Sequence, residues 1–203
     1  MKPRDDPFPD RNFTLTDYFD QCRKKCLPPD IPLSPDSPTF GIPHQTPIKM
    51  DHTTLNPFTV VGISVRTTNQ NGQAAQDIEA LFNRFIEGNL AAQIPQKAEE
   101  AIYSVYTDYE GDHTQPYTVL LGCRVSKVST VPDGMVAKQI EGGTYQPFVA
   151  KGRLHEGVVY QTWTKIWDAD LDRAYTADFE VYGEKAQNTE AAEVDIYIAL
   201  NKE

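Results

Sequence analysis

The chain contains two stretches with the same order of predicted secondary structure, and this repeat limits its fold more than any other feature. Each stretch begins with a strand, continues with a helix whose apolar residues recur three and four positions apart, and ends with two more strands. The first set is expected at residues 58–68, 74–88, 101–109 and 117–125. The second set is expected at residues 135–152, where a Gly-Gly pair bends the strand, and at 155–171, 176–183 and 193–200. Tandem βαββ units predict an α+β domain with pseudo-twofold symmetry, an antiparallel or mixed sheet, and both helices on one side.

Proline marks the part of the chain where this pattern is absent. Of the 15 prolines, 11 lie in residues 1–57, and so many prolines prevent a sustained helix or sheet ladder. We therefore predict a largely irregular N-terminal extension over residues 1–56 and a folded domain over residues 57–203. Residues 1–57 hold 8 acidic and 7 basic side chains, so most of the formal net charge of −10 belongs to the folded part.

Composition also limits the partners and cofactors. An acidic chain argues against direct binding of nucleic acid, which needs a basic face. No apolar run approaches the roughly 20 residues that span a bilayer, and residues 1–13 lack the apolar core of a secretory signal, so we expect a cytoplasmic protein without membrane contact. Cys22 and Cys26 match neither zinc-site nor redox spacing, and the three cysteines fit a reducing compartment. No metal and no cofactor are expected.

A carboxylate interrupts one of the predicted strands. Residues 176–184, TADFEVYGE, have the composition of a half-buried strand, yet Glu180 lies in the middle. Strand alternation places Phe179 and Val181 on one face and Glu180 on the other. If the apolar residues of the last two strands pack under the helices, the opposite face of the sheet gathers Glu180, Tyr182, Asp195 and Tyr197.

A sheet face of carboxylates and tyrosines is suited to an apolar cation. Aromatic rings supply stacking and cation–π attraction, and a carboxylate supplies charge. Tyr103 and Tyr145 lie in other predicted strands and are further candidates for ligand contact. The second predicted helix carries Trp163 on its apolar stripe, which fits either core packing or a pocket wall. The simpler alternative is a solvated sheet face, which is also polar.

Four segments of the second unit resemble a known family. They are GGTYQPFVAKG, YQTWTKIW, DFEVYG and the terminal EVDIYIAL, and FTVVGISVRTT agrees in order and spacing. Together they resemble the GyrI-like small-molecule-binding domain over residues 57–203. This is the effector-binding domain of many AraC- and MerR-type bacterial transcription activators, and it also occurs alone in DNA gyrase inhibitor proteins.

The resemblance implies a fold and a site. The implied fold is the duplicated βαββ unit, with a cleft between the halves that takes amphipathic and often cationic compounds. The family's central pocket carboxylate corresponds to Glu180, and Asp195 and Tyr197 match the acid and tyrosine of the terminal strand. Tyr145 and Trp163 match recurrent aromatic positions. Burial would raise the pKa of a carboxyl group such as Glu180.

Three functions follow as alternatives. The first is a stand-alone protein that binds lipophilic, drug-like cations. The second is a hydrolase of small electrophilic or cyclic compounds with Glu180 as general base. The third is a protein-interaction module like the gyrase inhibitors, with a topoisomerase as its partner. A transcriptional role would need a transcription regulator as partner, and a second copy of the chain is a further candidate partner.

Overall fold

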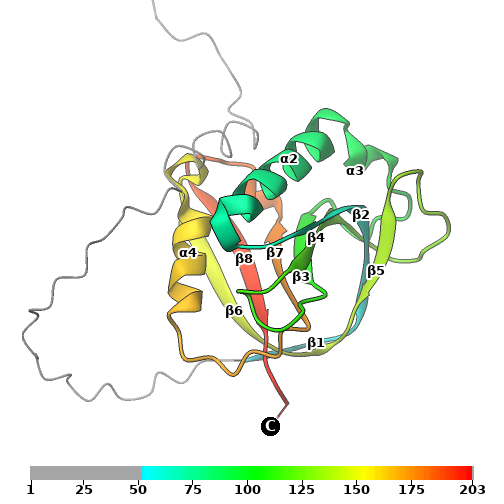
Figure 1. The fold of residues 1–203 in the computed structure, drawn as a ribbon. Helices are drawn as coiled ribbons and strands as arrows, with labels where there is room; N and C mark the ends of the chain where they lie inside the picture. Colours follow the sequence, from blue (N-terminus) through cyan, green and yellow to red (C-terminus); the bar gives the residue numbers. More distant parts are fainter. Residues whose placement is uncertain (1–51, 203) are drawn as a thin grey trace, which may run out of the picture.

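Two βαββ units build one antiparallel sheet with both helices on the same side (Figure 1). The computed structural model describes residues 52–202, so most of the predicted extension lies outside the described residues. The first unit comprises β2 (Phe58–Thr67), α2 (Gln73–Glu87), β3 (Ile102–Thr107) and β4 (Tyr117–Val125). The second comprises β6 (Gly143–Gly152), α4 (Val158–Trp167), β7 (Ala177–Tyr182) and β8 (Ala192–Ala199). The α+β fold and its duplicated element order, both predicted from sequence, are confirmed.

Shorter elements complete the chain. Two strands precede the two units, β1 (Thr53–Leu55) and β5 (Val136–Ile140). A short helix, α3 (Leu90–Gln93), follows α2, and 3₁₀ turns occupy Gln70–Gly72, Leu154–Glu156 and Glu184–Ala186. Within residues 52–202, the first regular element begins at Thr53, a few residues before the Pro57 boundary suggested by the patterning. No helix in the described part of the chain is long and apolar enough to cross a membrane.

The leading strand of each unit bends and pairs in both halves of the sheet. The strand order is β1-β6-β8-β7-β3-β4-β2-β5, and every pairing is antiparallel. The strand predicted over residues 135–152 is split at its Gly-Gly bend into β5, which pairs with β2, and β6, which pairs with β8. In the same way β1 pairs with β6 and then leads into β2. The bends cross closely, because a Cβ at Gly142 would lie 2.6 Å from the carbonyl oxygen of Leu55. The two edges of the curled sheet meet at this crossing (Figure 1).

Each face of the sheet carries its own buried hydrophobic layer. The helix-side layer contains Phe82 and Phe85 of α2, Trp163 and Ile166 of α4, and Ile196 of β8 beneath them. The second layer fills the inside of the curl and is centred on aromatic side chains, namely Phe58, Tyr103, Tyr145, Phe179 and Tyr197. Since each face carries a buried layer, polarity alone does not distinguish the inner from the outer face of these strands.

Strands β2 and β4 approach closely where two glycines face each other. Gly62 of β2 pairs with Gly122 of β4, and a Cβ at Gly122 would lie 2.1 Å from the carbonyl oxygen of Val61. We expect Gly122→Ala to lower the free energy of unfolding by about 2 kcal/mol, because backbone atoms on the facing strand must move. The control is Gly143→Ala, where a Cβ meets nothing within 4 Å. Urea denaturation measures both variants, and equal losses of unfolding free energy would contradict this interpretation.

Candidate functional site

Glu180 is buried at the centre of the helix-side face and is surrounded by aromatic donors. Its side chain lies on β7, and the residue is 2 % exposed. Oε1 accepts hydrogen bonds from the indole Nε1 of Trp163 at 2.6 Å and from the Tyr106 hydroxyl at 2.9 Å. Oε2 accepts one from the Tyr182 hydroxyl at 2.8 Å. Among the described residues, no cation pairs with this carboxylate.

The surroundings of Glu180 follow the pseudo-twofold symmetry. Strands β3 and β7 pair where the two halves meet, and Ser104 faces Glu180 in that register. Tyr106 follows Ser104 by two residues, as Tyr182 follows Glu180, so the two hydroxyl donors come from equivalent positions. Each helix places a ring edge against one of them. Trp163 of α4 lies 5.2 Å from the Tyr106 ring at 70°, and Phe82 of α2 lies 5.8 Å from the Tyr182 ring at 73°.

Burial and hydrogen bonding act in opposite directions on the charge of Glu180. Burial raises the pKa of Glu180 above its ordinary value, and the hydrogen bonds from Trp163, Tyr182 and Tyr106 oppose that rise. Burial and the nearby Glu180 charge raise the pKa of Tyr106 well above its ordinary value. The tyrosine therefore stays a hydrogen-bond donor, and only neutral groups donate hydrogen bonds to the Glu180 carboxyl group.

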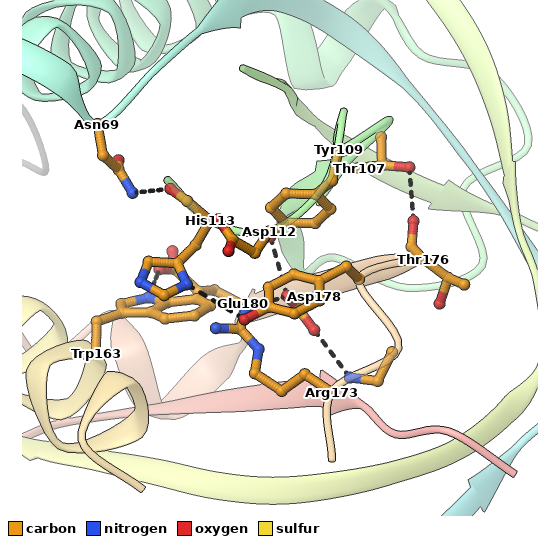
Figure 2. Close-up of polar contacts among 12 residues, drawn as sticks. Asn69, Thr107, Tyr109, Asp112, His113, Trp163, Arg173, Thr176, Asp178 and Glu180 are labelled. Carbon is orange, nitrogen blue, oxygen red and sulfur yellow. Dashed lines mark hydrogen bonds and ion pairs between the residues drawn. The ribbon is translucent and has the colours of Figure 1, made fainter. Parts of the chain in front are cut away.

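A second buried carboxylate lies two residues before Glu180 on the same face of β7. Asp178 Oδ2 pairs with Arg173 Nη2 at 2.7 Å and accepts a hydrogen bond from Tyr109 at 2.9 Å, and Oδ1 accepts one from the Ala199 amide at 2.8 Å. Figure 2 shows Arg173 and Tyr109 converging on Asp178. Burial raises the pKa of Asp178, and Arg173 opposes the rise. Unlike Glu180, this carboxylate has a cation beside it.

The sequence reasoning missed Asp178 and Arg173. The alternation that marked Glu180 also places Asp178 on its face, and this was the available signal. Arg173 precedes the strand in an irregular connection, and nothing in its spacing indicates that it turns back onto β7.

A series of aromatic ring contacts leads from Glu180 toward the surface. The rings of Trp163 and Trp167 lie 6.1 Å apart, and His113 stacks on Trp167 at 5.9 Å with an interplanar angle of 5°. His113 also stacks on Tyr175 at 6.2 Å. The guanidinium carbon of Arg173 lies over the face of the Tyr175 ring, 4.4 Å from the ring centre. Burial, followed by the nearby Arg173 charge, lowers the pKa of His113. This series therefore connects the buried carboxylates to partly exposed aromatic residues.

The structure corrects the predicted arrangement of the two sheet faces. Glu180, Tyr182 and Trp163 come together on the helix side, where Glu180 faces Ile196 across the β7–β8 pairing. The prediction that Glu180 and Tyr182 share a face with Asp195 and Tyr197, away from the helices, is wrong. The physical reason is that the residues assigned to the helix side divide between the two layers. Ile196 of β8 does lie under the helices, whereas Phe179 of β7 packs in the second layer, inside the curl.

The remaining predicted site residues lie on that other face. Phe179 stacks on Tyr197 at 4.9 Å and contacts Tyr145 at 5.4 Å and Tyr103 at 6.0 Å. Asp195 is exposed and faces Val181 in the register. The structure therefore does not bring these four residues beside Glu180.

Comparison with known proteins agrees with the fold. The family model of Cass2, integron-associated effector binding protein, matches residues 53–200. The putative transcriptional regulator protein YobU of Bacillus subtilis (strain 168) is 28 % identical over 145 residues, which cover 70 % of this chain and 91 % of YobU.

Two solved structures share the architecture. The integron cassette protein VCH_CASS2 of Vibrio cholerae is 29 % identical, with a TM-score of 0.57 over 74 % of this chain and 95 % of that one. SAV2435 bound to tetraphenylphosphonium has a TM-score of 0.62 over 76 % of this chain and 94 % of that one, and its 16 % identity shows a shared fold alone. Because the family match covers most of the sequence and the described fold is the duplicated βαββ unit, the chain belongs to the Cass2 family of integron-associated effector binding proteins, with the GyrI-like effector-binding fold.

Proposed function

We propose that the protein binds a lipophilic, drug-like cation and that Glu180 is the central carboxylate of the site. The observation that carries this proposal is the buried carboxylate of Glu180, which has three aromatic-ring donors and no cation among the described residues. Burying an ionised carboxylate costs several kcal/mol unless it is paired. A cationic ligand would supply the missing pair.

The aromatic residues around Glu180 also favour this class of ligand. Ring faces attract a cation without requiring a fixed hydrogen-bond pattern, which suits bulky ions with delocalised charge. The rings of Trp163, Tyr106 and Tyr182 border the carboxylate. Phe82 packs on Tyr182, and Trp167 and His113 extend the ring contacts outward from Trp163.

The family and its relatives support the same reading. The chain belongs to an effector-binding family, and a protein of the same fold binds tetraphenylphosphonium. YobU is a putative transcriptional regulator. An effector-dependent role in transcription would follow if the ligand-bound form contacts a regulator protein, which is the partner that we propose.

Replacement of Glu180 tests the proposal. Tetraphenylphosphonium titrated into the wild-type protein should change the tryptophan fluorescence saturably, because Trp163 contacts the site. Glu180→Gln should weaken this binding at least tenfold, or about 1.4 kcal/mol, because the amide keeps the side-chain shape and removes the charge.

The matched control is Asp195→Asn, which removes the same charge from an exposed position on β8. Its affinity for tetraphenylphosphonium should equal that of the wild type. Equal losses in both variants would indicate a general effect of net charge, and a wild-type protein that binds no cation would refute the proposal.

A further inference from the structure

Ser104 is a buried hydroxyl residue that faces Glu180 across the junction of the two halves. It is 0 % exposed, and the β3–β7 register pairs it directly with Glu180. Its Oγ has no hydrogen-bond partner within the described part of the chain. The Ser104 side chain lies close enough to Tyr106 to oppose part of the rise in the pKa of that phenol. The two hydroxyl groups are nevertheless not placed for a hydrogen bond. A buried, unpartnered hydroxyl destabilises a folded protein, so its position beside the carboxylate needs a reason.

The hydrogen bonds to Glu180 leave room for one more donor next to Ser104. A carboxylate oxygen accepts about two hydrogen bonds. Oε1 already has two, from Trp163 and Tyr106, whereas Oε2 has one, from Tyr182. The site therefore contains one carboxylate oxygen with unused capacity and, across the strand pair, one hydroxyl oxygen that accepts no bond.

We propose that the cation is a protonated secondary amine, with one N–H donated to Glu180 and the other to Ser104 Oγ. This inference rests on the proposed function and specifies its ligand class. A secondary ammonium has two N–H donors, a tertiary ammonium has one, and a quaternary ion has none. Directly opposed residues in an antiparallel pair have Cβ atoms about 4.5–5.5 Å apart, and one ammonium nitrogen can bridge side chains at that separation. Ser104 is then the residue that distinguishes a secondary amine from a tertiary one.

Three tricyclic compounds that differ only at nitrogen test this inference. Desipramine, imipramine and the N-methyl quaternary derivative of imipramine carry two, one and no N–H groups in their cationic forms. At pH 7 we expect the wild-type protein to bind desipramine about tenfold more tightly than imipramine, which corresponds to about 1.4 kcal/mol. Ser104→Ala should bring the two affinities together by weakening desipramine binding alone. Ser64→Ala, which removes an exposed strand hydroxyl, should leave the ratio unchanged.

The stability of the ligand-free protein provides a second readout. Since Ser104 Oγ has no partner within the described residues, Ser104→Ala should leave the midpoint of urea denaturation unchanged or raise it. A lower midpoint together with an unchanged affinity ratio would assign the hydroxyl a purely structural role and overturn the inference. Equal wild-type affinities for desipramine and imipramine would also overturn it. Either result would leave the proposed function standing if Glu180→Gln still weakens all three compounds, whereas binding that is insensitive to Glu180→Gln would refute both.

Discussion

Arg173→Met is expected to lower the free energy of unfolding by about 3–5 kcal/mol, because it leaves the Asp178 charge buried without a cation. The Arg173 and Asp178 side chains are 5 % and 0 % exposed, and they pair at 2.7 Å. Methionine retains much of the apolar stem of arginine, so the loss reports mainly on the pair. Urea denaturation at pH 7 measures the change.

A double variant separates the ion pair from the packing of Arg173. Arg173→Met with Asp178→Asn removes both charges, and it should recover most of the lost stability because the oxygen of the new side-chain amide can still accept from the Ala199 backbone N–H. The single variant should also become relatively more stable as the pH falls, because protonation neutralises the unpaired Asp178. If the double variant is as unstable as the single one, Arg173 acts through packing on Tyr175 and not through its charge.

The elements of the fold were predictable from sequence because each has a clear period. The apolar stripe of residues 74–88 became α2, with Leu81, Phe82 and Phe85 buried. The alternating strands became β2, β3, β4, β7 and β8. The exchange of β1 and β5 between the halves was not predictable, because it depends on which strands pair far apart in the sequence. The Gly-Gly bend indicated only that the chain changes direction there.

The sequence predicted three residues of the candidate site, Glu180, Tyr182 and Trp163, but the predicted geometry was wrong. Glu180 stood out because a carboxylate in an otherwise half-buried strand is unusual, and the structure buries it among aromatic donors. Alternation correctly separated Glu180 from Phe179, but it does not state which of two faces meets the helices. The usual rule assigns the apolar face to the helices, and it fails here because the curl of the sheet buries the other face as well.

The partners of Glu180 depend on distant register. Tyr106 and Ser104 come from the first unit, 74 and 76 residues away. Their sequence surroundings are those of ordinary strand residues. Only the β3–β7 pairing shows that a serine and a carboxylate face each other at the junction of the halves.

Cation binding should weaken about tenfold for each pH unit below the pKa of Glu180, or about a hundredfold over two units. Burial raises that pKa, and a proton on Glu180 competes directly with the cation. Tetraphenylphosphonium is the appropriate probe between pH 8 and pH 4, because its own charge does not change with pH. Glu180→Gln should bind weakly at every pH, and a wild-type affinity that stays flat across this range would contradict the central role of the carboxylate.

The same pKa shift should make the ligand-free protein less stable as the pH rises, whereas its affinity for the cation increases. A raised folded-state pKa means that the folded protein holds this proton more tightly than the unfolded chain does. The stabilising contribution is fully present below the unfolded pKa of about 4.3, and it is lost as the pH rises through the higher folded value. Asp178 and His113 also titrate near the site, so the relevant quantity is the difference in unfolding free energy between the wild type and Glu180→Gln at each pH. As the pH rises, we expect the wild type to lose stability relative to Glu180→Gln, while its affinity for the cation increases. Both changes have one cause, because the ionisation of Glu180 lowers the stability of the folded protein and creates the charge that the ligand neutralises.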